Sequence, residues 1–458
     1  MKNNVKTGFW PKRTQLFVTV YHALWHLLLP VVLGLLWKKG KKEPLYRQHW
    51  AERFGCVQSK LVSPIWVHSS SMGELRGASP FVKALLAQGL PVYHTTFTPA
   101  GRSEAQRQFA AAIQTGQLQV GYLPLELSWA VRRFIRAVKP RCAIMTEIDT
   151  WPVLLRTIKR CGLPLVMANA QYPRKSLERD QKWWALRSGV FQAYDLVLCK
   201  STTHAQRFME VGCRDVRVVG ETRFDLPLPA AQLTAGQALV LAENLHITQR
   251  PVLAVASAVE GEDEQFLDAF QRLRKALAAA GRPSPLLVYV PRSPQRFDAV
   301  YDLMTAQGLR VQRRSTALDA HLKPMPGSRL DETDVLLGDS LGEMYFYLTL
   351  AQAVVVGASF VPLGSHNVIE PLALKKPVLV GPSMWGIEYP GVEAIEAGVL
   401  ASLPDIAALS QRIFDLLSDP AVYALSIAGV ERFYAEHAGS TQKHMAVFLP
   451  WLKEHHAD

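Results

Sequence analysis

Short apolar runs alternate with longer amphipathic stretches along the chain beyond Gly55. The runs are rich in Val, Ile, Leu and Ala and are bounded by Gly, Pro or polar residues, so they predict buried strands, and the stretches between them have the hydrophobic spacing of helices. This alternation is typical of β-α-β units built on parallel sheets. The predicted strands are Pro64–His68, Pro91–Thr95, Arg141–Met145, Pro164–Ala168, Leu196–Cys199, Val216–Val219, Pro251–Ala256, Leu286–Val290, Val335–Leu337, Ala353–Val356 and Pro377–Val380.

The alternation stops after Phe224 in a polar, alanine-rich stretch and starts again at Pro251. Two sets of α/β units separated near residues 225–250 predict an α/β protein with two doubly wound, Rossmann-like domains that face a cleft. Ligands of such sheets bind beyond the carboxyl ends of the strands. We therefore expect functional residues directly after the predicted strands.

A different hydrophobic pattern precedes the two domains. The segment Leu16–Trp37 contains no Asp, Glu, Lys or Arg, and a helix of this length reaches about 30 Å, enough to cross the hydrocarbon core of a bilayer. Lys12 and Arg13 precede it, whereas lysines at positions 38, 39, 41 and 42 follow it directly. This excess of positive charge on the C-terminal side predicts attachment to an anionic membrane surface, with the large domains left on the cytoplasmic face.

Two other interpretations of this helix remain open. Thr19, His22 and His26 share a helical face, so the helix can lie in the membrane interface instead of spanning the bilayer. It can also be a buried core helix, although the lysine cluster favours a membrane. We predict a membrane anchor at residues 1–42 that the fold does not need, an N-terminal domain at residues 43–225 and a C-terminal domain at residues 226–458.

The composition narrows the class of protein. Of the 458 residues, 49% are hydrophobic and 20% are charged, and the formal net charge is +12. These values exclude a disordered or fibrous protein, and the charge fits nucleic acid, an anionic membrane or an anionic substrate. No zinc-ligand spacing, RNP-type aromatic pattern or recognition-helix signal accompanies the charge, so we expect no nucleic-acid partner. The five cysteines are widely spaced without a C-x-x-C pair, which predicts reduced thiols.

The first predicted strand enters the loop His68-Ser69-Ser70-Ser71-Met72-Gly73-Glu74, in which small residues lead into a helix. Such a loop brings backbone N–H groups close to a ligand. Glu74 would lie in the first turn of that helix, where an acid also stabilises the helix itself by a few tenths to about 1 kcal/mol. Judged on this loop alone, the structural role of Glu74 is the better explanation.

More polar clusters follow other predicted strands. Glu147 and Asp149 lie two residues apart, so on an extended segment their carboxylates would face the same way. Arg292 and Arg296 follow a strand of the second half. The remaining clusters are Asn169-Ala170-Gln171, Gly220–Asp225 and the long loop Gly357–Pro371, which enters a helix.

In this order and at these intervals, the clusters resemble the motifs of the bacterial 3-deoxy-D-manno-octulosonic acid (Kdo) transferase family. The resemblance runs from about Tyr21 to the C-terminus, and the acid pair with Trp151-Pro152 and the loop ending at Pro371 are its most specific parts. Its other parts are Ser71-Met72-Gly73-Glu74, Thr95-Thr96-Phe97-Thr98-Pro99-Ala100-Gly101 and Pro291-Arg292-Ser293-Pro294-Gln295-Arg296-Phe297.

The resemblance implies a membrane-attached, inverting glycosyltransferase of the GT-B type. It would move Kdo from CMP-Kdo to a lipid A precursor in the synthesis of the lipopolysaccharide inner core, without a cofactor. The absence of a D-x-D motif or a histidine cluster at a strand end fits a metal-independent reaction, in which arginine and helix dipoles must neutralise the leaving phosphate.

The resemblance also implies roles for single residues. Glu74 would be the base that takes the proton of the acceptor hydroxyl, with Ser71, Gly73, Glu147 and Asp149 on the acceptor side. In the C-terminal domain, Glu370 would hold the ribose of the donor. Arg292 and backbone N–H groups of the long loop would neutralise the phosphate. The loop residues concerned are Ser359, Gly364, Ser365, His366 and Asn367.

Several positions depart from the family's motifs. Gln171 stands where the family has Arg, Glu221 where it has Asn, Arg223 where it has Lys, and Asp149 where it has Glu. Val153 and Ser293 replace an Asn and a His. A GT-B transferase that uses a related sugar or another membrane acceptor is therefore an alternative hypothesis. A catalytically lapsed homologue that serves as a membrane scaffold is a second alternative.

Overall fold

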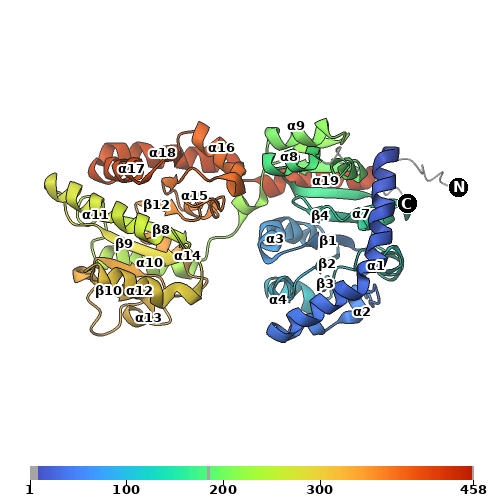
Figure 1. Cartoon of the computed structure of the whole chain (residues 1–458), viewed down its shortest axis with the longest axis horizontal. Coiled ribbons are helices and arrows are strands. Elements are labelled where there is room, and N and C mark those ends of the chain that lie inside the picture. Colours follow the sequence, from blue (N-terminus) through green and yellow to red (C-terminus); the bar gives the residue numbers. More distant parts are fainter. Residues whose placement is uncertain (1–8, 183–185, 456–458) are drawn as a thin grey trace. The chain divides into compact units, whose positions relative to one another are not determined.

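The structure is a computed structural model that describes residues 9–182 and 186–455. The chain forms two compact units, Met1–Leu226 with Ala438–Asp458, and Pro227–His437 (Figure 1). Within the described residues, each unit has one seven-stranded sheet in which all neighbouring strands are parallel. The predicted class, two doubly wound α/β domains, is therefore confirmed.

The sheet of the first unit has the order β3-β2-β1-β4-β5-β6-β7. Every residue of β1 and β4 is buried, as expected for parallel strands that are covered on both faces by helices. The strand order reverses between β1 and β4, so the loops after these two strands diverge and leave room at their carboxyl ends. The strands are β1 (Ile65–Ser69), β2 (Val92–Thr96), β3 (Leu118–Tyr122), β4 (Cys142–Thr146), β5 (Leu165–Ala170), β6 (Leu196–Cys199) and β7 (Val216–Val218).

Helices cover the two faces of this sheet with separate apolar clusters. Side chains of α3, α4 and α19 pack on one face, and those of α6, α7, α9 and the short helix η2 pack on the other. The helices are α1 (Lys12–Lys42), α2 (Trp50–Arg53), α3 (Met72–Ala87), α4 (Pro99–Gln108), α5 (Ala110–Gln114), α6 (Ser128–Val138), α7 (Pro152–Arg160), α8 (Arg174–Lys182), α9 (Thr202–Glu210) and α19 (Ser440–His455), with 3-10 turns η1 (Pro44–Arg47), η2 (Ser188–Ala193) and η3 (Thr222–Asp225).

The second unit repeats the plan with the order β10-β11-β9-β8-β12-β13-β14, and its order reverses between β8 and β12. Helices α11 and α17 pack together over one apolar cluster, while α14 lies against β8 and α10. The strands are β8 (Val252–Ala258), β9 (Leu286–Pro291), β10 (Val311–Arg313), β11 (Val335–Leu337), β12 (Ala353–Val356), β13 (Val378–Val380) and β14 (Leu400–Ser402). The helices are α10 (Ala230–Ala242), α11 (Asp263–Ala279), α12 (Phe297–Ala306), α13 (Arg314–Ala317), α14 (Met344–Leu350), α15 (Ile369–Ala373), α16 (Glu388–Glu396), α17 (Ile406–Ser418) and α18 (Pro420–His437), with 3-10 turns η4 (Pro294–Arg296), η5 (Leu330–Glu332) and η6 (Trp385–Ile387).

Every predicted strand is present, but β3, β10 and β14 were not predicted. All three lie at the edge of a sheet. An edge strand needs less apolar surface than a central one, and parts of these strands are only half-buried or exposed. Their sequences therefore lack the continuous apolar run that marks the central strands.

The last helix differs from the predicted domain boundary, which placed residues 226–458 in one domain. Residues 438–458 belong to the first unit, because α19 inserts Phe448 and Trp451 into the cluster beneath α3. The Phe448 ring meets the Phe81 ring edge-on with a centroid distance of 5.7 Å. The Asp225 carboxylate accepts hydrogen bonds from the backbone N–H groups of Gly439 (2.7 Å) and Thr441 (2.5 Å), which fix the start of the helix.

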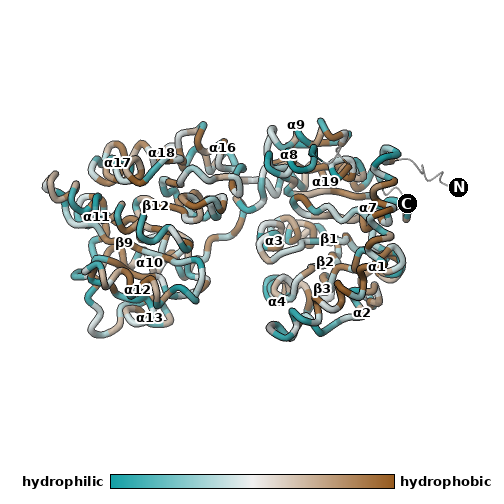
Figure 2. The backbone as a smooth tube through the Cα atoms, in the orientation of Figure 1, coloured by the Kyte–Doolittle hydropathy of each residue, from teal (hydrophilic) through white to brown (hydrophobic). Residues whose placement is uncertain are grey.

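The expectation that the fold does not need residues 1–42 stays a prediction, although the N-terminal helix α1 packs against the first unit. Hydrophobic residues extend along its length (Figure 2), and by length and composition it can cross a membrane. However, Val18 and Leu36 of α1 are buried in clusters of the first unit, together with Trp10 just before the helix. The helix is therefore part of the first unit's core as well as an apolar surface.

Candidate active site

Glu74 lies where β1 gives way to α3. Ser71 caps this helix, and its hydroxyl accepts a hydrogen bond from the N–H of Glu74 (3.2 Å). The Glu74 carboxylate in turn accepts from the N–H of Ser70 (2.7 Å), the residue before the cap, so hydrogen bonds in both directions fix the start of α3, as in a capping box. Gly73 lies beside them, and its carbonyl accepts from Arg223 (3.2 Å). Glu74 therefore does stabilise the start of α3, which is the structural role considered for it from the sequence.

The surroundings of Glu74 also suit proton transfer. Its side chain is half-buried, so part of it remains accessible. Burial raises the pKa of Glu74 to about 7, and the negative charge of Glu147 contributes to this rise. A carboxylate with a pKa near neutrality is a more effective general base than an ordinary one.

The loop after β4 does not have the extended form that the sequence predicts. Glu147 adopts a left-handed backbone conformation with φ 61°, and residues 147–148 form a turn. The two acids therefore have different partners. Glu147 contacts Arg223 (2.7 Å), the amide of Gln171 (2.7 Å) and Lys200 (3.6 Å), whereas Asp149 turns toward β1. The expectation that the two carboxylates face the same way is wrong.

Asp149 is joined to the first loop by side-chain hydrogen bonds. The Ser70 hydroxyl lies 2.9 and 3.0 Å from the two Asp149 oxygens, and Nε2 of His68 lies 3.4 Å from one of them. Nδ1 of the fully buried His68 lies 3.0 Å from the Thr95 carbonyl, and an N–H that donates there leaves Nε2 as an acceptor. Burial raises the pKa of Asp149, and the nearby Glu74 raises it further. The Ser70 hydroxyl lies 3.1 Å from the same Nε2, so His68, Ser70 and Asp149 form one connected polar group at the ends of β1 and β4.

Lys200 is a site residue that the sequence analysis missed. Its side chain is almost fully buried and contacts Glu221 (2.9 Å), Glu147 (3.6 Å) and the Gln171 oxygen (3.2 Å). Burial by itself would raise the pKa of Glu147, but the positive charges of Lys200 and Arg223 outweigh it and lower that pKa. Lys200 directly follows β6, so the rule of inspecting strand ends would have found it. We call Glu147, Gln171, Lys200, Glu221 and Arg223 the buried charge cluster.

In the second unit, the long loop after β12 is shaped by Glu262, which the sequence analysis did not assign. This carboxylate is fully buried and accepts hydrogen bonds from the N–H groups of Ala358 (2.7 Å), Ser359 (2.9 Å) and Phe360 (2.9 Å). Glu262 follows β8 and the loop follows β12, so the two elements meet where the strand order reverses. Because Glu262 accepts hydrogen bonds from these three N–H groups, they are not available to an anionic ligand.

The predicted use of the loop's backbone N–H groups therefore needs correction. Besides Ser359, the N–H of Gly364 donates to the Ser383 hydroxyl (3.0 Å), that of Ser365 to the Ala358 carbonyl (2.7 Å) and that of His366 to the Gly357 carbonyl (3.2 Å). These donors are used within the protein because the loop folds back on itself. The loop approaches the Trp385 ring so closely that position 364 must be glycine. Its φ is 91°, and a Cβ there would lie 2.6 Å from the ring.

Side chains of the same loop offer groups for a ligand. Among the described residues, the Ser365 hydroxyl and Nε2 of His366 are buried without a hydrogen-bond partner. Burial lowers the pKa of His366 to about 4, and the charge of Arg292 contributes to this lowering, so the exposed Arg292 lies nearby. Glu370 is half-exposed in the first turn of α15, and the Asn367 side chain accepts from the N–H of Ile369 (3.0 Å). Arginine, hydroxyl and imidazole groups together suit an anionic ligand.

Within the described residues, no group of three or more His, Cys, Asp or Glu side chains has the arrangement of a metal site. The predicted acceptor-side residues Ser71, Gly73, Glu74 and Asp149 gather at the reversal of the first sheet, and Glu147 lies behind them in the buried charge cluster. The predicted donor-side residues gather at the reversal of the second sheet. The two groups of residues differ in chemistry. Carboxylates dominate the group in the first unit, whereas the group in the second unit adds an arginine, hydroxyl groups and an imidazole to Glu370.

Comparisons with known proteins give the family context. A family model described as 3-deoxy-D-manno-octulosonic-acid transferase (kdotransferase) matches residues 48–226. The chain is 37% identical to the 3-deoxy-D-manno-octulosonic acid transferase of Bordetella pertussis, over 94% of this chain and 99% of that protein. It is 30% identical to the enzyme of the same name from Haemophilus influenzae, over 94% and 98%. A glycosyltransferase structure from Rickettsia africae has the same fold, with a TM-score of 0.54, 12% identity and coverage of 86% of this chain and 98% of that one.

The buried charge cluster generates a stability prediction. Lys200→Met would leave Glu147 and Glu221 with the more exposed Arg223 as their shared cation, and removing the partner of a buried charge costs up to about 3–5 kcal/mol. Lys159→Met is the matched control, because the Lys159–Asp195 pair of the same unit is more exposed and should contribute about 1 kcal/mol or less. Denaturant unfolding measures both variants. A Lys200→Met protein as stable as the control variant would contradict the proposed role of the cluster.

Proposed function

The chain belongs to the 3-deoxy-D-manno-octulosonic acid (Kdo) transferase family, a family of glycosyltransferases, and on this premise we propose that it moves Kdo from CMP-Kdo to a lipid A precursor. The reaction would serve the inner core of lipopolysaccharide at the cytoplasmic face of the inner membrane. The observation that carries the proposal is Glu74, which lies in a half-buried acidic site at the reversal of the first sheet with a pKa near 7.

In the proposed reaction, a hydroxyl oxygen of the acceptor attacks the anomeric carbon of Kdo. The new C–O bond forms as the bond between that carbon and the CMP phosphate oxygen breaks, and the bonding electrons leave with CMP. Attack from the side opposite the leaving group inverts the anomeric centre. Glu74 takes the hydroxyl proton, which balances the step and avoids a free oxonium intermediate.

The buried charge cluster supports this role for Glu74. Because Lys200 and Arg223 keep Glu147 ionised, a fixed negative charge remains close to Glu74 and opposes its ionisation. Glu74 then binds a proton more tightly than an ordinary carboxylate, which favours removal of the hydroxyl proton. Asp149, bonded to Ser70, holds the Glu74 loop against the loop after β4.

The second unit supplies the groups proposed for the donor. Arg292 lies close to His366, and the unpaired Ser365 and His366 groups are suited to phosphate oxygens. A Glu370 carboxylate at the start of α15 can accept hydrogen bonds from both ribose hydroxyls. Positive charge from Arg292 would stabilise the leaving phosphate without a metal ion.

The departures from the family motifs do not favour a lapsed enzyme. Gln171, Glu221 and Arg223 all belong to the buried charge cluster and contact Glu147, Lys200 or both. Exchanges that pair with one another preserve charge compensation in the site, because every exchanged residue has a partner within the cluster. A related sugar or another membrane acceptor remains the alternative, and assays with CMP-Kdo and a lipid A precursor distinguish it.

Removing the basicity of Glu74 should abolish most turnover. Glu74→Gln keeps the size of the side chain and its capping bonds, so we expect turnover to fall about 100- to 10,000-fold with CMP affinity nearly unchanged. Radiolabelled CMP-Kdo and a lipid A precursor, followed by thin-layer chromatography, measure the rate. Glu104→Gln is the control, a buried carboxylate paired with Arg76 and Arg107, and it should affect the melting temperature more than the rate. A folded Glu74→Gln enzyme with near-normal turnover would exclude this base.

The pH profile tests the charge at Glu147. In the wild type, kcat/KM should fall as the pH drops through about 7, because Glu74 becomes protonated. Glu147→Gln removes a neighbouring negative charge and leaves Glu221 as the one carboxylate of the buried charge cluster beside Lys200 and Arg223, and both changes favour ionised Glu74. The acidic limb should therefore move to lower pH. A limb that stays in place, or moves to higher pH, would show that Glu147 does not tune the base.

Donor binding should depend on Glu370. Glu370→Ala removes the proposed acceptor of the ribose hydroxyls and should weaken CMP binding by about 1–3 kcal/mol, the usual loss for a hydrogen bond to a charged group. Isothermal titration calorimetry measures the affinity. Glu396→Ala removes an exposed acid of α16 in the same unit and should leave the affinity unchanged. Equal affinities for both variants would place the donor elsewhere.

A further inference from the structure

The N-terminal helix α1 is held against the first unit by polar contacts as well as apolar ones. The Tyr21 hydroxyl donates to the buried Glu126 carboxylate (2.5 Å), and Arg156 of α7 donates to the Thr19 hydroxyl (3.1 Å). The N–H of Ser128 donates to Nε2 of His22 (3.4 Å). These contacts lie in the half of the helix nearer its N-terminus, and Leu36 packs with Tyr46 near the other end. The helix is therefore docked over most of its length.

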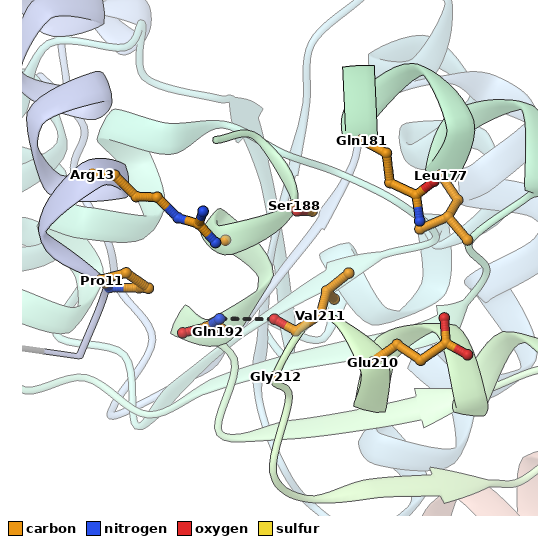
Figure 3. A pocket seen from close by; sticks show the side chains of 10 residues that line it. Pro11, Arg13, Leu177, Gln181, Ser188, Gln192, Glu210, Val211 and Gly212 are labelled. Atoms are coloured by element: carbon orange, nitrogen blue, oxygen red, sulfur yellow. Dashed lines mark hydrogen bonds between the residues drawn. The ribbon is translucent and has the colours of Figure 1, made fainter. Parts of the chain in front are cut away.

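The start of α1 is docked as well. The Trp10 indole donates to the Val190 carbonyl of η2 (3.2 Å). Pro11 and Arg13 line a cavity of about 260 Å³ together with residues of η2, α8 and the turn before β7 (Figure 3). Across this cavity the Gln192 side chain donates to the Val211 carbonyl (2.8 Å). Both ends and the middle of α1 thus lie along the surface of one folded unit.

The outer side of α1 carries an exposed apolar stripe. Its spacing of three or four residues places the side chains on one side of the helix, and the stripe extends for about 28 Å at 1.5 Å per residue. Leu27, in the middle, is 75% exposed. Monomeric soluble proteins rarely leave so long an apolar surface in water. The stripe consists of Leu16, Val20, Leu24, Leu27, Val31 and Leu35.

Exposed cationic side chains surround the stripe. Lys12 and Arg13 lie at the start of α1, and Lys38 and Lys41 lie at its end. Further arginines are exposed on α7, which packs against α1, and on α6, whose first residue contacts His22 of α1. An apolar stripe with basic residues at its margins complements a bilayer surface that contains anionic lipids. Among these exposed arginines, Arg132 and Arg160 have charges that act on His22 of α1.

We propose that α1 does not cross the bilayer but lies in the plane of the membrane, with its apolar stripe inserted and its opposite side bound to the first unit. A spanning orientation would place the Tyr21–Glu126 contact and Arg156 at the depth of the hydrocarbon, where such groups are costly. Pulling the helix away from the unit would instead expose the buried Val18 and Leu36. The in-plane orientation preserves every docking contact. This inference rests on the proposed membrane attachment and specifies its geometry.

The docking connects the membrane to the candidate active site. The Glu126 carboxylate that binds Tyr21 also accepts from the N–H groups of Val153 (2.8 Å) and Leu154 (3.1 Å) in the first turn of α7. The loop that carries Asp149 directly precedes this helix. An in-plane α1 therefore holds the acceptor-side loops at the lipid surface, where a lipid-linked acceptor presents its hydroxyl groups. A spanning helix with a flexible attachment would not provide this alignment.

Depth measurements with spin labels distinguish the two orientations. Cys56 and Cys161 are exposed and would first be replaced by Ser, while Cys142, Cys199 and Cys213 are buried. Single labels would follow at Val20, Leu27 and Leu35 of the full chain, bound to vesicles of phosphatidylcholine and phosphatidylglycerol. We expect all three labels at a similar depth, about 5–10 Å below the headgroups. A label at Val62, which is 80% exposed in the same unit, should stay in water.

Two results would overturn the proposal. If Leu27 lies near the bilayer centre and Val20 and Leu35 lie nearer opposite surfaces, the helix spans the membrane. If all labels stay in water, the stripe has no lipid partner. Kdo transfer assayed on the same preparations is a separate readout, so a failed depth prediction with normal transfer contradicts only the orientation of α1. Lost transfer with equal depths would contradict only the proposed activity.

A matched pair of double variants tests the stripe itself. Leu27→Glu/Val31→Glu places two charges in the stripe, and vesicle flotation should show at least about tenfold weaker binding, because charged side chains resist transfer from water into the acyl region. Leu241→Glu/Leu425→Glu changes two residues of the second unit that are at least as exposed as Leu27 and Val31, and this variant should bind as the wild type does. If the stripe variant still floats normally but changes from dimer to monomer in light scattering, a second copy of the chain covers the stripe, and the proposal is wrong.

Discussion

A buried carboxylate remains ionised only where nearby positive charge or hydrogen-bond donors compensate for the lost solvation, and this constraint governs the first unit. Glu147 is enclosed at the carboxyl end of β4, where burial opposes its charge. Lys200 from the end of β6 and Arg223 from η3 supply the compensation. The resulting fixed negative charge, together with burial, keeps the pKa of Glu74 near 7. The loops after β1 and β4, the ends of β5 and β6, and η3 must all be in place for this one charge to be stable.

Each unit uses a buried acid to shape the loops at the reversal of its sheet. In the second unit, Glu262 binds three successive N–H groups of the loop after β12. In the first unit, Asp149 bridges to Ser70, and Glu74 accepts from the Ser70 N–H. These acids thus accept hydrogen bonds from backbone N–H groups that would otherwise be available to a ligand. Ligand recognition is then left to side chains, such as those of Ser365 and His366.

The helix α1 meets two requirements that together explain its unusual composition. One side must pack into the first unit, as Val18 and Leu36 do, and the other side presents the exposed stripe centred on Leu27. A helix that is apolar on both sides has the composition of a membrane span, although its polar contacts with Glu126 and Arg156 tie it to a folded unit. Hydropathy cannot separate these cases, because it counts apolar residues without regard to what covers each of them.

The sequence by itself determined the fold class, the central strands and most residues of the candidate site, because both buried parallel strands and the loops after them have strong local signals. It also located Glu74 and the acid pair. The tertiary structure alone decided that α19 completes the first unit, that Glu147 and Asp149 point to different partners, and that Lys200 and Glu262 support the site. These features depend on contacts between segments far apart in the chain, such as Glu262 with Ser359 or Phe81 with Phe448. No periodicity or local propensity records such contacts, because they form only when the sheets bring the strand ends together.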